Sequence, residues 1–402
     1  MTTSALTGVT VLEFSHTIMG PCAGLLLADF GARVIKIEPA PDGDNTRGLN
    51  GFASGFFATF NRNKESLSVN LKTDAGKAIV HALVKDADIV LENYGPGTME
   101  KLSCDYESLR ALNPGIIYLA LKGYLSGPLQ NRPALDEVVQ FQSGLAYMTG
   151  PVGQPLRAGA SIIDILGAVF GVTGVLAALR EKEHTGHGQK VSSALFETAA
   201  FLMAPHMAGG ATTGETVPPM TARRGAWGVY DVFNMADDQS LFIGVTSDAQ
   251  WQRFCEEFSL QSLYSDERLA TNPQRTSERS WLIPSLNDHL KTLPYERVAQ
   301  GCERADVSWS PVGQPADLHH HPQLISKGLL NIALDTARET LASHTTLPGM
   351  PLEFNDGQRS SVVSQPPHNG EHTHAILKSL GYDDAHIAAL LSEHVITSPC
   401  AG

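Results

Sequence analysis

Short apolar runs alternate with longer segments of mixed pattern through the first third of the chain. Apolar and β-branched runs of four to eight residues are typical of buried strands, and intervening segments of ten or more residues are typical of helices. Strands are predicted at 9–14, 33–38, 67–71, 87–92 and 115–121, and helices at 20–30 and 73–85. Because strands and helices alternate, the pattern predicts βαβ units and a parallel sheet, the arrangement of the α/β class.

Polar residues follow three of the predicted strands at their carboxyl ends, where ligands bind in open α/β sheets. They are Ser15-His16, Asn93-Tyr94 and Lys122-Gly123-Tyr124. No GxGxxG sequence follows the first strand, and GxxxxGK[ST] does not occur. Dinucleotide binding by a Rossmann fingerprint and nucleotide binding by a P-loop therefore lose their main support.

The pattern changes after residue 205. The segment 206–225 is rich in Gly, Thr and Pro and predicts a linker, and the runs 228–233 and 240–245 predict a β-hairpin. Helical patterns continue to about Val307, and two more helices are predicted at 374–380 and 384–392. At 402 residues the chain exceeds the usual single core, so we expect two domains, or one domain with a large insertion.

Composition narrows the kind of partner. The chain is 42% hydrophobic and 18% charged, as ordinary globular proteins are, and its formal net charge of −13 argues against nucleic acid or an anionic membrane as the main partner. Five scattered cysteines without a CxxC pair are typical of reduced thiols, and no secretion signal is recognisable, so we expect a cytoplasmic protein. The apolar run 162–179 contains Asp164 and three glycines and predicts a buried helix rather than a membrane span.

Asp164 is the first candidate for chemistry. It lies in RAGASIIDILGAVFGVTGVLAALRE, immediately before the long apolar helix, where an Asp is typical of an N-cap. A helix N-terminus also stabilises an anion, so the same carboxylate would stay ionised and available as a nucleophile in an apolar setting. The spacing leaves both roles open, and they do not exclude each other.

Six segments, in order along nearly the whole chain, resemble the family III CoA-transferases, the family of formyl-CoA transferase and carnitine CoA-transferase, which also includes α-methylacyl-CoA racemase. They are LTGVTVLEFSHTIMGPCAGLLLADFGARVIKIEP, GDNTRG, NRNKESLSVNLK, ENYGPGTMEKL, AGASIIDILGAVFGVTGVLAALREKEHTGHGQKV and GEHTHAILKSLGY. The resemblance implies a Rossmann-like large domain made of 1–205 and 326–402, a linker at 206–225 and a smaller α+β domain at 226–325. It also implies a homodimer whose two subunits interlock.

The resemblance further implies a reaction. The family's nucleophilic aspartate stands at the position of Asp164. In the transferases it attacks an acyl-CoA to give a mixed anhydride and then an aspartyl-CoA thioester, from which a free carboxylic acid takes the CoA. Coenzyme A would thus be part of a substrate, and neither a permanently bound cofactor nor a metal is expected. The run His319-His320-His321 is expected in a solvated loop, because consecutive histidines cannot easily turn to one tetrahedral centre.

The same resemblance assigns a CoA site along the predicted sheet edge. Its residues would be His16, Ile18, Met19, Val69, Lys72, Asn93, Tyr94 and Lys101. The two lysines suit this role, since each ammonium is a point charge that can bind a CoA phosphate. Without the resemblance they would be interpreted as solvated surface lysines, and His16 as a structural loop residue.

Two sequence features separate CoA transfer from racemisation. The family's racemases have a His-Asp pair after the GxxGP turn and a Glu after a small-domain strand. This chain has Leu135 before Asp136, and Thr246-Ser247-Asp248 after LFIGV. Because removal and return of an α proton need a base on each face of the carbon, these losses favour a transferase over a racemase or epimerase.

Arg223 and Arg224 are candidates for the acceptor region, together with Asp136. Arginine pairs bidentately with carboxylates, so the two suggest a second carboxylate on the acceptor and hence a C4–C6 dicarboxylic acid, with succinyl-CoA as the donor. A solvated surface linker would also explain both arginines. A CoA-binding protein without catalysis remains a further alternative.

Overall fold

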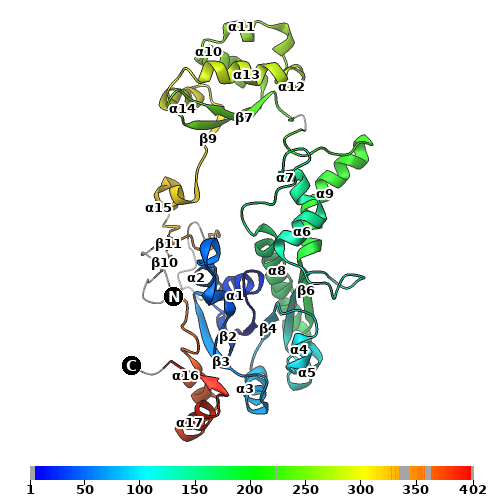
Figure 1. Ribbon diagram of the computed structural model, residues 1–402, viewed down its shortest axis with the longest axis vertical. Helices are drawn as coiled ribbons and strands as arrows, with labels where there is room; N and C mark the ends of the chain where they lie inside the picture. Colours follow the sequence, from blue (N-terminus) through cyan, green and yellow to red (C-terminus); the bar gives the residue numbers. More distant parts are fainter. Residues whose placement is uncertain are drawn as a thin grey trace. The chain divides into compact units, whose positions relative to one another are not determined.

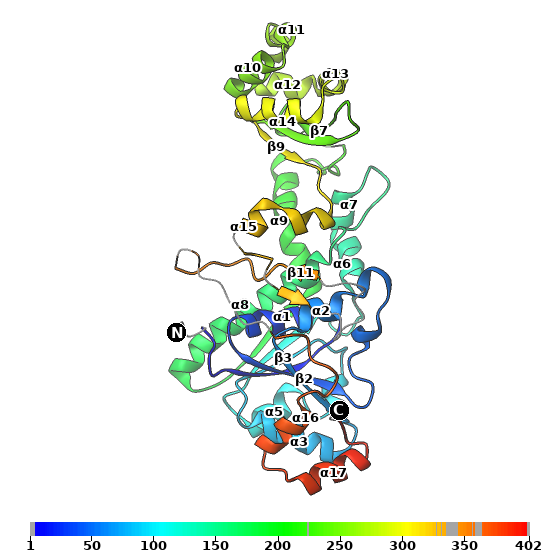
Figure 2. The ribbon, with the colours of Figure 1, turned by 90° about the vertical axis from the view of Figure 1, so that its left-hand side faces the viewer.

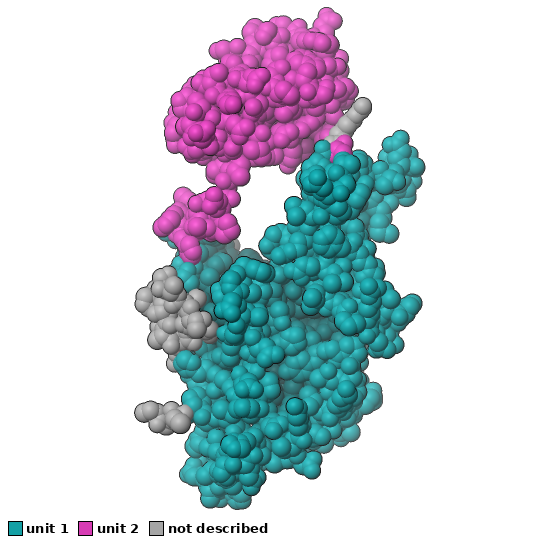
Figure 3. All heavy atoms as spheres, in the orientation of Figure 1, with its two compact units in different colours: residues 1–221, 323–402 teal, residues 222–322 magenta. Residues whose placement is uncertain are grey.

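The structure is a computed structural model of the 402-residue chain and describes residues 5–222, 225–326, 328–330, 332–334, 345–355, 357 and 364–399. The chain divides into two compact units (Figure 3). The large unit comprises residues 1–221 and 323–402, and the small unit comprises residues 222–322. Each unit has a hydrophobic core of its own.

The large unit is built on a seven-stranded sheet with the order β12-β3-β2-β1-β4-β5-β6 (Figure 1). Its strands are β1 Thr10–Phe14, β2 Arg33–Pro39, β3 Lys64–Val69, β4 Ile89–Glu92, β5 Ile117–Lys122, β6 Lys190–Ala194 and β12 Ile396–Thr397. Neighbouring strands are parallel except β12, which pairs antiparallel with β3. The predicted α/β class is therefore confirmed, with a mostly parallel central sheet.

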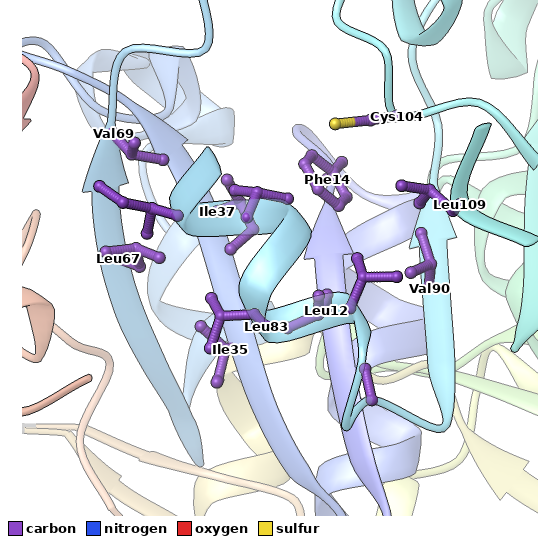
Figure 4. Packing of buried hydrophobic residues seen from close by; sticks show 14 of the residues in the cluster. Leu12, Phe14, Ile35, Ile37, Leu67, Val69, Leu83, Val90, Cys104 and Leu109 are labelled. Atoms are coloured by element: carbon purple, nitrogen blue, oxygen red, sulfur yellow. The ribbon is translucent and has the colours of Figure 1, made fainter. Parts of the chain in front are cut away.

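Helices cover both faces of this sheet (Figure 2). One face carries α1 Met19–Asp29 and α8 Ile162–Thr185, with α9 Leu195–Thr213 beside α8, and the other carries α3 Asp74–Val84, α5 Tyr106–Leu112 and α16 Thr373–Ser379. Leu12 and Phe14 of β1 enter one core and Val11 enters the other, so strands buried on both faces have continuous apolar runs. Figure 4 shows the first core, where Leu83 and Leu109 from the covering helices lie over the strand residues.

Several elements differ from the sequence prediction. The strand expected at 67–71 is found as β3 at Lys64–Val69. Its start was missed because Lys64 and Ser66 are polar, although both are buried. β6 was not predicted, since KVSSA contains little apolar surface. α9 continues to Thr213 and so occupies the first part of the expected linker 206–225. Short helices also fill the connections: α2 Phe56–Asn61, α4 Thr98–Lys101, α6 Asp136–Ser143, α7 Leu145–Thr149, η1 Asn45–Gly48 and η2 Gly51–Ala53.

The C-terminal segment returns to the large unit. The two predicted terminal helices are confirmed as α16 and α17 Asp384–Ser392, and β12 then joins the edge of the sheet. The hydroxyl of Thr373 accepts a hydrogen bond from the amide of Ser68 at 3.2 Å and donates one to the carbonyl of Thr397 at 2.9 Å. These contacts hold the C-terminal segment against β3, in the same core as the N-terminal strands.

The small unit is a three-stranded antiparallel sheet with helices packed on it. β7 Val229–Asn234 and β8 Ser240–Val245 form the predicted hairpin, and β9 Ser308–Pro311 pairs with β8. Its helices are α10 Asp248–Glu257, α11 Gln261–Tyr264, α12 Asn272–Ser277, α13 Arg279–Leu290 and α14 Tyr295–Arg304. The guanidinium of Arg275 is fully buried, lies 5.3 Å from the ring centre of Trp251 and pairs with Asp248.

Within the described residues, α8 is the one helix long and apolar enough to cross a membrane by length and composition. Its glycines lie against the sheet and α1, since a Cβ on Gly167 would come within 2.5 Å of Met19 and one on Gly174 within 2.7 Å of Val191. Its outer face is open, with Val169 at 41% and Phe170 at 39% exposure. The helix predicted to be buried is therefore buried on one face.

Candidate active site

A cavity of about 290 Å³ opens in the large unit where the parallel strands end. Six of the candidate residues line it: His16, Ile18, Met19, Asn93, Asp136 and Asp164. They come from the β1–α1 loop, the end of β4, and the first turns of α6 and α8. Loops that follow different parallel strands meet at one edge of a sheet, which explains how segments far apart in sequence form one site.

Asp164 is the third residue of α8, and the helix cap is not made by its own side chain. The N-cap residue is Ser161, which makes no side-chain capping hydrogen bond. Oδ2 of Asp136 accepts instead from the backbone amides of Ile163 at 2.8 Å and Asp164 at 3.0 Å. The interpretation of Asp164 as the cap is therefore wrong, because a carboxylate from α6 already occupies the free amides.

This arrangement also changes the ionisation of Asp164. Burial, followed by the negative charges of Asp136 and Glu137, raises the pKa of Asp164 to about 7. The expectation that the helix N-terminus would hold Asp164 ionised is thus corrected. Near neutral pH both the protonated and the ionised form of this carboxyl group are populated. A pKa of this kind is common in groups that exchange protons or act as nucleophiles at that pH.

Asp136 is also held by a residue of its own helix, α6. It is 3% exposed, and Nε2 of Gln140 donates to its Oδ1 in a short hydrogen bond. Oε1 of Gln140 in turn accepts from the amide of Ala158 at 2.9 Å. Sequence reasoning missed Gln140, although its spacing of four residues from Asp136 places both on one side of a helix.

The β1–α1 loop forms another part of the cavity wall. The amide of His16 donates to Oδ1 of Asn93 at 3.0 Å, and Nδ2 of Asn93 donates to the carbonyl of His16 at 2.9 Å. The imidazole stacks on Tyr94 with ring centres 5.6 Å apart. Burial lowers the pKa of His16, since it disfavours the charged imidazolium, so the ring is neutral at neutral pH.

Four described candidates do not line this cavity: Val69, Lys72, Tyr94 and Lys101. Val69 is 1% exposed, so its side chain belongs to the core. Lys72 and Lys101 are exposed; Lys72 lies shortly after the end of β3, and Lys101 is the last residue of α4. Arg223 and Arg224 lie outside the described residues.

Lys122 was noted in the sequence as a strand end without a role. It lines this cavity and also a second one of about 290 Å³ over β4, β5 and β6. Its Nζ donates to Oε2 of Glu92 at 2.7 Å and to the carbonyl of Tyr94 at 2.9 Å. Its ammonium thus fixes the loop that carries Asn93 and Tyr94.

No group of three or more His, Cys, Asp or Glu side chains in the described part of the chain could hold a metal ion. His319 and His320 belong to the 3-10 helix η4 Pro315–His320.

Comparison with known proteins places this site in a family. Residues 6–373 match CoA-transferase family III, and the chain belongs to it. The chain is 32% identical over 93% of its length to a succinate–glutarate CoA-transferase of Agrobacterium fabrum, of which 95% is covered. It is 34% identical over 80% of its length to an acetyl-CoA:oxalate CoA-transferase of Acetobacter aceti, of which 84% is covered.

The fold agrees with that placement. The crystal structure of a CAIB/BAIF family protein from Brucella suis matches with a TM-score of 0.83 at 28% identity, covering 94% of this chain and 100% of that one. The resemblance to family III CoA-transferases is thereby confirmed. The protein is an enzyme, an acyl-CoA:carboxylate CoA-transferase.

Proposed function

We propose that the enzyme moves CoA from an acyl-CoA, with succinyl-CoA as one donor, to a C4–C6 dicarboxylic acid through covalent intermediates on Asp164. The observation that carries the proposal is the carboxylate of Asp164 in a cavity lined by His16 and Asn93, with its pKa raised to about 7. The relatives support a dicarboxylic acid as the acceptor, because the oxalate, succinate and glutarate in their names are all dicarboxylates.

The exchange can be written with all bonds balanced. An oxygen of the Asp164 carboxylate attacks the thioester carbonyl, the C–S bond breaks, and CoA thiolate leaves a mixed anhydride. The thiolate attacks the aspartyl carbonyl and releases the first acid as a carboxylate. The carboxylate of the second acid then attacks the aspartyl-CoA thioester, the C–S bond breaks, and CoA thiolate leaves a second mixed anhydride. The thiolate attacks the acyl carbonyl of the second acid, the C–O bond to Asp164 breaks, and the Asp164 carboxylate is released with the new acyl-CoA. No proton is gained or lost, so the ionised form of Asp164 is the one that reacts.

The other candidate residues divide the binding of the two substrates. His16, Asn93 and Tyr94, with the backbone at Ile18 and Met19, would hold the CoA chain along the cavity wall. Lys72 and Lys101 would bind its phosphates, and the side chain of Val69 would act only by supporting the backbone. Asp136, with Arg223 and Arg224, is assigned to the acceptor and intermediate region.

The direct test is a screen of acids. The enzyme is incubated with succinyl-CoA or acetyl-CoA and a panel of mono- and dicarboxylic acids, and new CoA thioesters are detected by mass spectrometry. The proposal expects C4–C6 dicarboxylates to form thioesters fastest. Exchange with monocarboxylates alone would overturn the acceptor assignment, and no exchange with any acid would overturn the function.

Asp136→Asn is expected to shift the pH dependence of exchange toward acid. The substitution removes a negative charge that raises the pKa of Asp164, so Asp164 should ionise at lower pH. The acid limb of kcat/KM should therefore move to lower pH, measured between pH 5 and 9. Glu107→Gln, on the exposed start of α5, is the matched control and should leave the profile in place. An unchanged profile in Asp136→Asn would show that the charge of Asp136 does not set the ionisation of Asp164 that limits the reaction.

Racemisation is the competing function, and the structure offers little to support it. Leu135 lines the cavity with an apolar side chain that cannot act as a base. Ser247 accepts from the amide of Gln250 as the cap of α10, and Asp248 pairs with the buried Arg275. Uptake of deuterium at the α carbon of an acyl-CoA in heavy water would identify racemisation, whereas exchange without uptake supports transfer.

We propose further that the enzyme is an interlocked homodimer. Phe170 of α8 and Phe201 of α9 contact each other edge to face at 5.3 Å, and Phe201 is 65% exposed. Val169, next to Phe170 in α8, is also exposed, and apolar side chains exposed close together are typical of protein–protein interfaces. Sedimentation should give about twice the chain mass of 43.1 kDa, and a monomer would contradict the dimer.

A further inference from the structure

The segment GDNTRG, residues 43–48, carries buried charges that the proposed reaction does not use. Oδ2 of Asp44 lies 2.9 Å from Nζ of Lys36, and both side chains are at most 2% exposed. Nζ of Lys36 also lies 3.3 Å from Oε1 of Glu13 and donates to the carbonyl of Ser15 at 2.8 Å. An ion pair buried to this degree holds its partners in one geometry, because neither charge can be left alone in the core.

A directed chain of hydrogen bonds leads from this ion pair to the cavity wall. Oδ1 of Asp44 accepts from the amide of Thr46 at 2.8 Å and from its hydroxyl at 2.7 Å. An ionised carboxylate can only accept, so the Thr46 proton is used in that bond and the Thr46 oxygen is left as an acceptor. It accepts from the amide of Thr17 at 2.8 Å.

Thr17 has a backbone conformation that its surroundings must stabilise. Its φ of +67° lies in the left-handed region, which a β-branched residue rarely adopts unless its surroundings impose it. The neighbouring backbone is clamped as well, with the Ser15 carbonyl on Lys36 and the amide and carbonyl of His16 on Asn93. Three consecutive residues at the start of the β1–α1 loop are thus fixed by side chains from three other segments.

We infer that Lys36, Asp44 and Thr46 are positioning residues for acyl-CoA binding. The buried ion pair orients the Thr46 hydroxyl, and that oxygen keeps Thr17 in its left-handed conformation. His16, Ile18 and Met19 are thereby held at the cavity wall. The inference rests on the proposed role of this loop in binding CoA, and it assigns a role to GDNTRG that the reaction chemistry alone does not require.

The test replaces the one oxygen that joins the ion network to the loop. Thr46→Val keeps the size of the side chain and removes the hydroxyl, whereas Thr46→Ser keeps the hydroxyl. Thr46→Val should raise the Kd of free CoA, measured by titration calorimetry, and the KM of acyl-CoA by about tenfold. The KM of the acceptor acid should not change, and Thr46→Ser should stay within about twofold of the wild type for both substrates.

Each outcome separates this inference from the proposed function. A lower Tm in Thr46→Val with an unchanged Kd for CoA would make Thr46 merely structural and overturn the inference, while the proposed function would stand. Equal weakening in Thr46→Val and Thr46→Ser would also overturn it, since the hydroxyl would not be the acting group. Wild-type enzyme that binds no CoA would overturn both. Should Thr46→Val fail to fold, Thr46→Ala removes the same oxygen without adding a methyl group and is read in the same way.

Discussion

Asp164→Asn is expected to abolish CoA exchange, with kcat falling on the order of 10⁴-fold or more, as when other enzymes lose a covalent nucleophile. The amide has nearly the shape of the carboxylate but no anionic oxygen to attack a thioester. Because Asp136 rather than Asp164 caps α8, the substitution leaves the hydrogen bonds of the helix start in place. The loss should therefore be chemical, with little change in the affinity for CoA.

A trapping experiment identifies the intermediate itself. Wild-type enzyme incubated with acyl-CoA and then with borohydride should carry a reduced side chain at position 164, located by peptide mass spectrometry. Asp164→Asn should show no such product. Asp86→Asn, which changes an exposed aspartate of the large unit, should react as the wild type does. Exchange retained by Asp164→Asn, or a reduced side chain at another residue, would refute the mechanism.

The same substitution is expected to stabilise the large unit at alkaline pH. The pKa of Asp164 is about 7 in the folded chain and near 3.9 in an unfolded one, so between these values the folded state binds more protons. The free energy of unfolding therefore falls as pH rises from about 4 to 7, by up to roughly 4 kcal/mol for a shift of about three units. Asparagine does not ionise and should avoid this loss, so Asp164→Asn should be more stable by about 2–4 kcal/mol at pH 8 and by little at pH 4.

The measurement has to report on the correct unit. All four tryptophans lie within residues 222–322, so tryptophan fluorescence follows the small unit. Hydrogen exchange at the amides of β1, β4 and β5 follows the large unit instead. A stability difference that opens between pH 5 and 8 in Asp164→Asn, and not in Asp86→Asn, supports the raised pKa. Equal stability of wild type and Asp164→Asn at both pH values would contradict it.

The two expected results have one physical cause. A carboxyl group that is partly buried beside two other carboxylates is costly to ionise, and the same cost makes its anion a more basic nucleophile. The enzyme would thus keep a destabilising residue at the place where the chemistry needs it, as active sites commonly do.

How far the site could be predicted depends on where its contacts lie along the chain. Asp164 and His16 stand at the edges of elements with strong local patterns, so their places beside a helix start and a strand end could be derived from the sequence. The cap by Asp136 joins residues 28 positions apart, and the bond from Thr17 to Thr46 spans 29. No local pattern encodes such a pairing, because it depends on how several loops meet at the sheet edge.

By itself, the sequence determined the alternation of strands and helices, the terminal helix pair and the membership of a CoA-transferase family. Periodicity and motif order are properties of neighbouring residues and survive without a fold. Only the tertiary structure decided that Asp136 caps α8, that the pKa of Asp164 is raised, and that Lys36 and Asp44 support the β1–α1 loop. These features exist only when burial removes water from charges that the folded chain has brought together.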